Sequence, residues 1–344
     1  MVGSSAIIPS AISDWKPWVS MVNSGFLDVG NHSYSHPNPN LTAIPAGELD
    51  HQINGAKALI ESNIPGFKVL WFVAPQSVYT QQILDIIKQQ HYAFTTAVPG
   101  YNSFSATREA LYSIKRIEAG SSTTLAEMNR WVDIAIARGE WLNEVMHGCD
   151  GEGWAPVPCT LAAQHFAYIA SKKNEIWSTG LTALVKYICQ RMSAKVSADT
   201  SQSSAIKINL TDTMDNAVFN QPLTLKTEIA GDWKQVRIEQ TSVLIYSAVT
   251  LSDGKNYVFY DAVPDKGIIT LSKVTSVGLK NRPQFRTGSG SYASQEYKIY
   301  DIKGRLLGTR GKPLSTQYTG TLLLPVQSRK TRIDLISIPG KTGI

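Results

Sequence analysis

Two histidines spaced four residues apart are the first residues whose types suggest chemistry. His32 and His36 lie in the stretch "VGNHSYSHPNPN", directly after the apolar run "FLDVG". Where a chain leaves a strand and begins to turn, this spacing lets both imidazoles point to one side. Two neutral histidine nitrogens at about 2.0–2.1 Å from one ion suit Zn²⁺ or a similar divalent metal. The spacing is equally compatible with two histidines of an ordinary surface loop.

A second group combines an imidazole, a carboxylate and an indole. His147 closes the run "EWLNEVMH", and the glycine-rich loop "GCDGEGWAPVP" then brings Asp150 and Trp154. An imidazole in this place can protonate a leaving group, and an indole can stack on the face of a sugar. The structural alternative is a buried His147 satisfied by a backbone carbonyl, with Trp154 in the core.

Two further positions complete the candidate site. Pro75 closes the run "KVLWFVAP", where a proline fixes how the chain leaves a strand and the next loop can line a cleft. Arg116 lies near the end of the run "LYSIKRI", where a guanidinium can bind a carboxylate. The alternatives are a structural role for Pro75 and an ordinary surface charge for Arg116.

The elements that must position these residues alternate between short β-type runs and amphipathic helical runs. We predict strands at 26–30, 68–74, 92–97, 111–117 and 141–147, and helices at 13–23, 46–62, 80–90, 123–138, 161–173 and 179–190. Ser13 is the predicted N-cap of the first helix, and Gly139 is predicted to end the fourth. Such βα repetition predicts a parallel sheet or barrel with its ligand site at the carboxyl ends of the strands.

The helical period stops near residue 193, and short alternating runs such as "AIKINL", "LTLKTEI" and "NYVFYDAV" follow. These runs predict a β-sandwich. We therefore predict an α/β domain over 1–192, a β-sandwich domain over 193–274, and over 275–344 a basic linker that contains Gly and Ser and a small β module. The strand-like parts of this last segment are "YKIYDIKGRLLG", "GTLLLPV" and "RIDLISI".

The net charge of +6 is unevenly distributed along the chain. Residues 1–190 carry a balance of −3 and residues 191–265 a balance of −2, whereas residues 266–344 carry +11. This basic segment predicts contact with an anionic cell-surface polymer, with a solvated basic tail as the alternative.

Several functional classes are excluded or disfavoured by what the sequence lacks. It contains no glycine-rich phosphate loop and no G-x-S-x-G elbow, which disfavours nucleotide-dependent and serine-hydrolase functions. No nucleic-acid partner is expected. The cysteines at 149, 159 and 189 impose no disulfide framework, although a Cys149–Cys159 bridge fits the spacing. The first residues do not read as a signal peptide, which predicts either an intracellular protein or a start that is not the natural one.

With these residues in view, the first 190 positions resemble the polysaccharide deacetylase family, also known as the NodB-homology domain or carbohydrate esterase family four. "NHSYSH" is similar to the H-S/T-x-x-x-H metal motif of that family, and "EVMHG" is similar to its late Leu-x-His motif. "WFVAP" resembles its middle strand end. The three stretches occur in the order that the family shows.

The resemblance implies an incomplete (β/α) barrel of the NodB-homology type that binds one divalent metal, Zn²⁺ or Co²⁺, and removes acetyl groups from sugars. It implies that His32 and His36 are metal ligands and that His147 is the general acid. By the same resemblance the substrate is an acetylated polysaccharide or oligosaccharide, contacted by Pro75, Arg116, Asp150 and Trp154. The full-length protein would be secreted or located in the cell envelope.

The sequence also departs from the family pattern. Family members begin with a strand ending in T-F-D-D-G, which supplies the catalytic base and the third metal ligand, and this sequence contains no Asp-Asp pair. "MVGSS" resembles the end of the second strand of the family, so we expect a missing first βα unit and a truncated secreted enzyme. The predicted function is therefore a metal-dependent deacetylase with impaired activity, or alternatively a carbohydrate-binding protein that cuts no bond.

Overall fold

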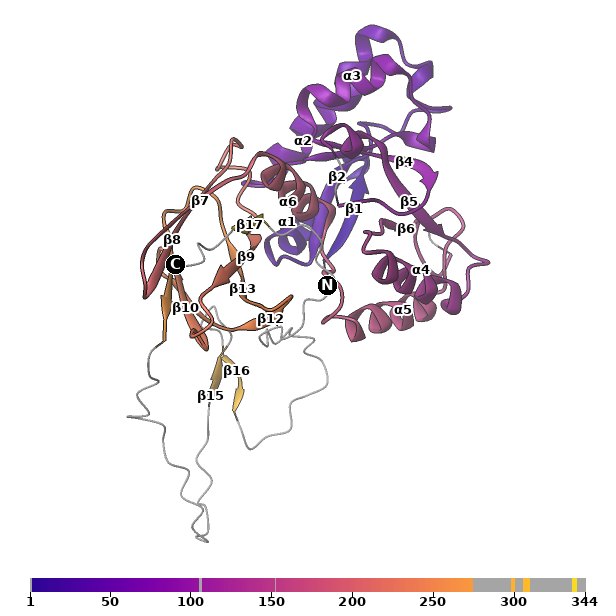
Figure 1. The fold of residues 1–344 in the computed structure, drawn as a ribbon. Coiled ribbons are helices and arrows are strands. Elements are labelled where there is room, and N and C mark those ends of the chain that lie inside the picture. Colours follow the sequence, from indigo (N-terminus) through magenta and orange to yellow (C-terminus); the bar gives the residue numbers. More distant parts are fainter. Residues whose placement is uncertain are drawn as a thin grey trace. The chain divides into compact units, whose positions relative to one another are not determined.

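The computed structural model describes residues 2–104, 107–151, 153–274, 298–300, 306–309 and 336–338. Six strands form one parallel sheet in which neighbours along the chain are also neighbours in space (Figure 1). This half-barrel, followed by antiparallel sheets, confirms the predicted fold class. The six strands are β1 Gly3–Ile7, β2 Leu27–Asn31, β3 Trp71–Val73, β4 Ala93–Pro99, β5 Ile114–Ala119 and β6 Glu144–Met146.

Helices connect these strands and bury both faces of the sheet. On one face Trp71 and Val73 share a core cluster with Leu184 and Ile188 of α6. On the other face the intervening Phe72 packs with α3. Side chains that alternate along β3 thus meet different helices, which explains why this strand is apolar throughout. The helices are α1 Lys16–Asn23, α2 Ala56–Asn63, α3 Gln81–Gln90, α4 Leu125–Arg138, α5 Cys159–Ser171 and α6 Leu181–Ser193.

Helix ends test two of the local predictions. Gly139 ends α4 with φ 63, as predicted, because a residue without Cβ adopts this left-handed conformation at little cost. The prediction that Ser13 caps the first helix is wrong. Helix α1 begins at Lys16, and the carboxylate of Asp14 accepts the Lys16 N–H at 3.0 Å. Asp14, rather than Ser13, therefore satisfies this backbone donor at the start of α1.

The helix predicted over 46–62 is interrupted. It consists of a 3₁₀ turn, η3 Ala46–Glu48, a π-helical turn, η4 His51–Gly55, and only then α2. A π-helical turn leaves backbone carbonyls without their usual i+4 partners. Two of these carbonyls accept hydrogen bonds from the loop that carries the histidines, as described below. The remaining short turns are η1 Pro9–Ala11, η2 Leu41–Ala43, η5 Pro75–Ser77 and η6 Glu109–Ser113.

The β-rich part contains a five-stranded sheet, β11-β10-β14-β8-β7, and a four-stranded sheet, β12-β13-β9-β17. Side chains from both sheets form one core, including Ile208, Leu225, Val236, Val258 and Leu271. Phe219, which precedes β9, lies in the core cluster of α6. The strands are β7 Lys195–Gln202, β8 Ala205–Thr211, β9 Leu223–Ile229, β10 Gln235–Gln240, β11 Val243–Ala248, β12 Thr250–Ser252, β13 Lys255–Ala262, β14 Ile269–Lys273 and β17 Ile336–Ile338.

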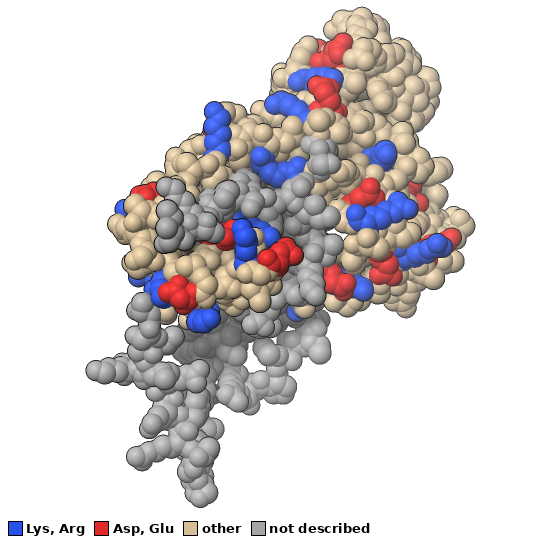
Figure 2. Space-filling model, in the orientation of Figure 1, with Lys and Arg blue, Asp and Glu red and all other residues tan. Residues whose placement is uncertain are grey.

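The last segment is described only in part. Strands β15 Lys298–Tyr300 and β16 Leu306–Thr309 pair in antiparallel orientation. "GTLLLPV" and most of the basic segment 266–344 lie outside the described residues, and the predicted domain boundaries remain predictions. On the face in Figure 2, basic and acidic side chains are interspersed over the described surface. Within the described ranges, no helix has both the length and the apolar character needed to cross a membrane.

Candidate functional site

The loop after β2 is folded around a buried asparagine. Asn31 is fully buried, and its Oδ1 accepts the Ser33 N–H at 3.0 Å. Its Nδ2 donates to the Ile53 carbonyl of the π-helical turn at 2.7 Å, and the Tyr34 N–H donates to the Gln52 carbonyl at 2.9 Å. The π-helical turn thus supplies the acceptors that fix this loop against the sheet.

This loop brings the two predicted metal ligands together. The Oγ of Ser33 accepts the His36 N–H at 3.0 Å, and both residues adopt positive φ angles of 67 and 50. The centroids of the His32 and His36 rings lie 4.9 Å apart. The i, i+4 spacing therefore places both imidazoles side by side at the carboxyl end of β2, as predicted.

His32 is held as a neutral imidazole. Its Nδ1 lies 2.8 Å from the Val73 carbonyl, which can only accept, so Nδ1 carries the proton and Nε2 keeps a free lone pair. Burial lowers the pKa of His32 to about 4, and the positive charge of Arg116 adds to this effect. Because the six strands are parallel, the loops after β2, β5 and β6 leave the sheet at the same edge.

A carboxylate that the sequence analysis missed, that of Glu118, links Arg116 to His147. Glu118 on β5 accepts from Arg116 Nη2 at 3.1 Å, and its second oxygen lies 3.4 Å from His147 Nδ1. Arg116 and Glu118 are two residues apart on one strand, so they share a face, and this alternation was the available signal. Arg116 is buried rather than an ordinary surface charge.

His147 and Trp154 lie next to each other at the surface. Their ring centroids are 5.3 Å apart with an interplanar angle of 84°. The His147 side chain is 37% exposed and Trp154 is 69% exposed, so neither residue is part of the core. The structure rejects the alternative of a buried His147 with a core tryptophan.

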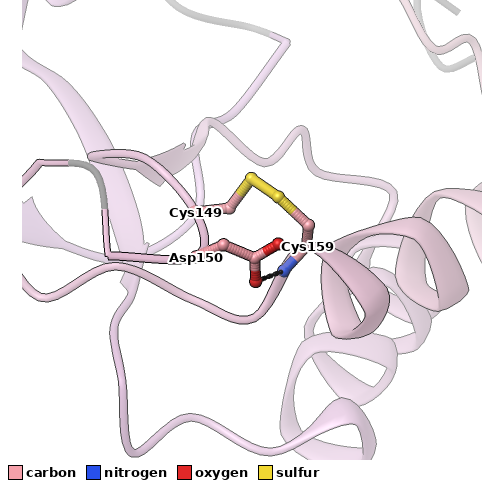
Figure 3. Close-up of a disulfide and its surroundings, with 3 residues drawn as sticks. All are labelled: Cys149, Asp150 and Cys159. Atoms are coloured by element: carbon pink, nitrogen blue, oxygen red, sulfur yellow. Dashed lines mark hydrogen bonds between the residues drawn. A yellow bond between two sulfur atoms is a disulfide. The ribbon is translucent and has the colours of Figure 1, made fainter.

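Pro75 and Asp150 have local partners. Pro75 is buried and begins the turn η5. Asp150 accepts the Cys159 N–H at 2.8 Å, beside a disulfide between Cys149 and Cys159 (Figure 3). The bridge that fitted the cysteine spacing is therefore formed. These contacts give both residues structural roles, and their predicted contact with substrate remains a prediction.

Strained backbone conformations also occur in the loops at the carboxyl edge of the sheet. In the described part of residues 1–194, the non-glycine residues with positive φ all follow strand ends: Ser33, His36, Gln76, Ser77, Asp150 and Ala155. Such conformations cost free energy and are enriched at functional sites. Their location agrees with the position of the candidate site.

The metal-binding potential of this edge is incomplete. His32 offers a free Nε2, and its Nδ1–H donates to a carbonyl, as is common for metal-bound histidines. Catalytic zinc sites, however, usually have three protein ligands. Among the described residues, no group of three or more His, Cys, Asp or Glu is placed to hold a metal ion. The described residues therefore do not make a complete metal site, and we derive no catalytic step through a metal.

Comparisons with known proteins gave one family match, over the first part of the chain, and one curated relative. Residues 6–95 match the family model described as "Polysaccharide deacetylase". This range includes His32, His36 and Pro75, whereas Arg116, His147 and Trp154 lie beyond it. A gellan lyase from Bacillus sp. is 25% identical over 287 residues, which cover 77% of this chain and 11% of the lyase.

Solved structures also resemble the chain over part of its length. A polysaccharide deacetylase from Bacillus cereus is 20% identical with a TM-score of 0.34, covering 38% of this chain and 41% of that chain. A family 4 acetyl xylan esterase from Clostridium thermocellum in complex with a cobalt ion is 17% identical with a TM-score of 0.33, covering 53% of this chain and 76% of that chain. The resemblance to the polysaccharide deacetylase family that "NHSYSH" predicted is thus confirmed by the family match over residues 6–95.

Proposed function

We propose that the carboxyl edge of the sheet binds an acetylated sugar residue of a polysaccharide or oligosaccharide and takes part in removing its acetyl group. The observation that carries the proposal is the arrangement around His147. This imidazole lies between the Glu118 carboxylate and the exposed Trp154 indole, at the edge that also presents His32 and His36. The deacetylase match over residues 6–95 supports the reaction class.

The residues have distinct roles in this proposal. Trp154 stacks on a sugar ring, since an exposed indole offers a flat apolar face. His147 gives a proton to the departing amine nitrogen or hydroxyl oxygen. The Glu118 carboxylate lies beside His147 Nδ1, where it orients the ring and would pair with the imidazolium. Arg116 holds Glu118 in place. His32 and His36 lie at the same edge and would offer two nitrogen donors to Zn²⁺ or Co²⁺, which the family resemblance implies as the cofactor.

The test is acetate release from acetylated chito-oligosaccharides and acetylxylan, measured with and without added Zn²⁺ or Co²⁺. We expect slow release that His147→Ala abolishes, and binding of the same glycans that Trp154→Ala weakens. Glu118→Gln keeps the shape of the side chain but not its charge, so an intermediate loss is expected. Release that is unchanged in His147→Ala would remove this residue from the reaction.

A second candidate function is glycan binding without bond cleavage. One observation favours it: among the described residues, no third metal-ligating group joins the imidazoles of His32 and His36. Under this alternative, the chain binds acetylated glycans through Trp154 and releases no acetate at any metal concentration. Binding without release would therefore select it.

Two further proposals concern location. We propose that the protein acts outside the cytoplasm, which the Cys149–Cys159 disulfide supports because disulfides persist in oxidising compartments. We also propose that the segment 266–344, with its balance of +11, binds an anionic cell-surface polymer. Co-sedimentation with isolated cell walls at low and high salt tests the second proposal, with salt-sensitive binding expected.

A further inference from the structure

The exposed Trp154 is carried by a short cross-linked lobe. We use the name tryptophan lobe for residues 149–151 and 153–159. The disulfide joins the ends of the lobe with Cα atoms 5.1 Å apart (Figure 3). A large exposed side chain in a free loop would lose much conformational entropy when it binds a ligand. The bonds that restrain the lobe therefore bear directly on ligand binding.

Backbone and side-chain bonds close the lobe at its base. The Asp150 N–H donates to the Val157 carbonyl at 3.1 Å, and the Val157 N–H donates to the Gly148 carbonyl at 3.2 Å. The carboxylate of Asp150 accepts the Cys159 N–H, the first residue of α5, at 2.8 Å. Val157 is 1% exposed and packs with Met128 and Ala162 in the core under β5. The base is thus anchored, and Trp154 projects from it.

The lobe folds back onto the backbone of His147. Gly153 has φ 83, and a Cβ atom at this position would lie 1.9 Å from the His147 carbonyl oxygen. A side chain at Gly153 would therefore push the lobe away from His147. Gly151 also has a positive φ, at 92, but a Cβ there would meet nothing within 4 Å. Of the two glycines, Gly153 lies against the His147 backbone and Gly151 does not.

We propose that Cys149, Cys159 and Asp150 are positioning residues for Trp154. The lobe that they close holds the indole ring at 84° to the His147 imidazole ring before a glycan arrives, so that the sugar stacked on Trp154 is placed beside His147. This proposal rests on the proposed function, since it names the device that gives this site its affinity. Opening the lobe should weaken glycan binding through Trp154 rather than through the imidazoles.

The first test needs no ligand. In protein labelled with ¹⁵N-tryptophan, the indole N–H signal of Trp154 is identified by its loss in Trp154→Phe, and its heteronuclear NOE reports side-chain order. We expect a rigid indole in the native protein and a mobile one in the Cys149→Ser/Cys159→Ser double variant. Gly153→Ala should also release the indole, whereas the matched control Gly151→Ala should not. Asp150→Ala should loosen it and Asp150→Asn, which keeps the acceptor, should restore it. An unchanged NOE in the double variant would overturn the proposal.

The second test measures affinity for acetylated chito-oligosaccharides by calorimetry. We expect the double cysteine variant to bind about tenfold more weakly, because preorganisation is lost. In a Trp154→Ala background the same cysteine changes should cause no further loss. Additive losses would contradict action through Trp154. If the native protein binds none of these glycans, the proposed function fails, while the indole NOE still decides whether the lobe positions Trp154.

Discussion

The α/β part and the β-rich part use the same unusual backbone conformation in different ways. In the β-rich part, non-glycine residues with positive φ are Thr241, Asp253 and Asp265, which lie in the turns between consecutive strands. Thr241 and Asp253 lie in hairpin turns, which require such angles, and Asp265 lies in the turn that joins β13 of one sheet to β14 of the other. In the α/β part, Ser33 and His36 adopt these angles where a parallel strand runs into a loop, and no hairpin requires it.

The two regions also differ in how they treat polar side chains. Around the carboxyl edge of the parallel sheet, Asn31 and Ser33 are completely buried and Arg116 is 9% exposed. Such groups are costly unless they are paired, and their bonds fix the loops that carry His32 and His147. The β-rich core is almost entirely apolar, with the Thr227–Tyr260 hydroxyl pair as a local exception. Buried polar networks with strained backbone therefore mark a site, whereas strained backbone alone marks a turn.

The largest effect that would sharpen this contrast is expected at His147. His147→Ala should lower the rate of acetate release about 100- to 10,000-fold, because a general acid contributes on this order. Tyr260→Phe removes a buried hydroxyl bond of the β-rich core and should leave that rate unchanged. Both variants are compared with the native protein in one assay with acetylxylan and acetylated chito-oligosaccharides. Similar losses in the two variants would break the contrast.

The buried polar network should also make the protein sensitive to acid. Burial lowers the pKa of His91, whose Nε2 faces the Asn31 amide, to about 3. The unfolded chain takes up a proton near pH 6.5, so the folded state loses stability as the pH falls from 6.5 towards 3. The loss by pH 4 is expected to be roughly 3 kcal/mol.

Urea unfolding of the native protein and of His91→Gln at pH 7 and pH 4 measures this loss. Glutamine cannot take up the proton but can still accept from Asn31, so the variant should show a clearly smaller difference between the two pH values. An equal pH dependence would assign the acid sensitivity to other groups.

Metal binding is expected to be weak and confined to the histidine loop. Calorimetry should detect Zn²⁺ or Co²⁺ binding to the native protein and none to His36→Ala, because one imidazole is a poor site. His51→Ala is the matched control, since His51 is an exposed histidine of the π-helical turn whose ring lies 4.4 Å from that of Tyr34 in the histidine loop. Retained binding in His36→Ala would remove His36 from the site.

The smallest effects come from relieving backbone strain in each region. Asp253→Gly in the β12–β13 turn should change the free energy of unfolding by no more than about 1 kcal/mol, in the stabilising direction. Ser33→Gly relieves the same kind of strain but removes the acceptor for the His36 N–H, so zinc affinity should fall. Thermal unfolding and calorimetry on both variants would show whether the two positions differ. Equal behaviour would remove the distinction between site strain and turn strain.

Much of the fold could be predicted because its signals are local. The βα repetition, the strands ending near His32 and His147, and the left-handed Gly139 follow from periodicity and residue type within short windows. Because all six strands are parallel, the ends of these strands share one edge, so even the convergence of distant loops could be anticipated. The resemblance carried by "NHSYSH" added the reaction class.

Other features were decided only by the tertiary structure. Three contacts are of this kind: the Glu118 bridge between Arg116 and His147, the bond from Asn31 to the Ile53 carbonyl, and the approach of the tryptophan lobe to His147. The sequence does not show which atoms are partners in these contacts. A carboxylate or an amide can pair with many groups, and burial and packing select one of them. Periodicity shows which face a side chain takes, whereas the choice of partner depends on how the loops of separate βα units meet.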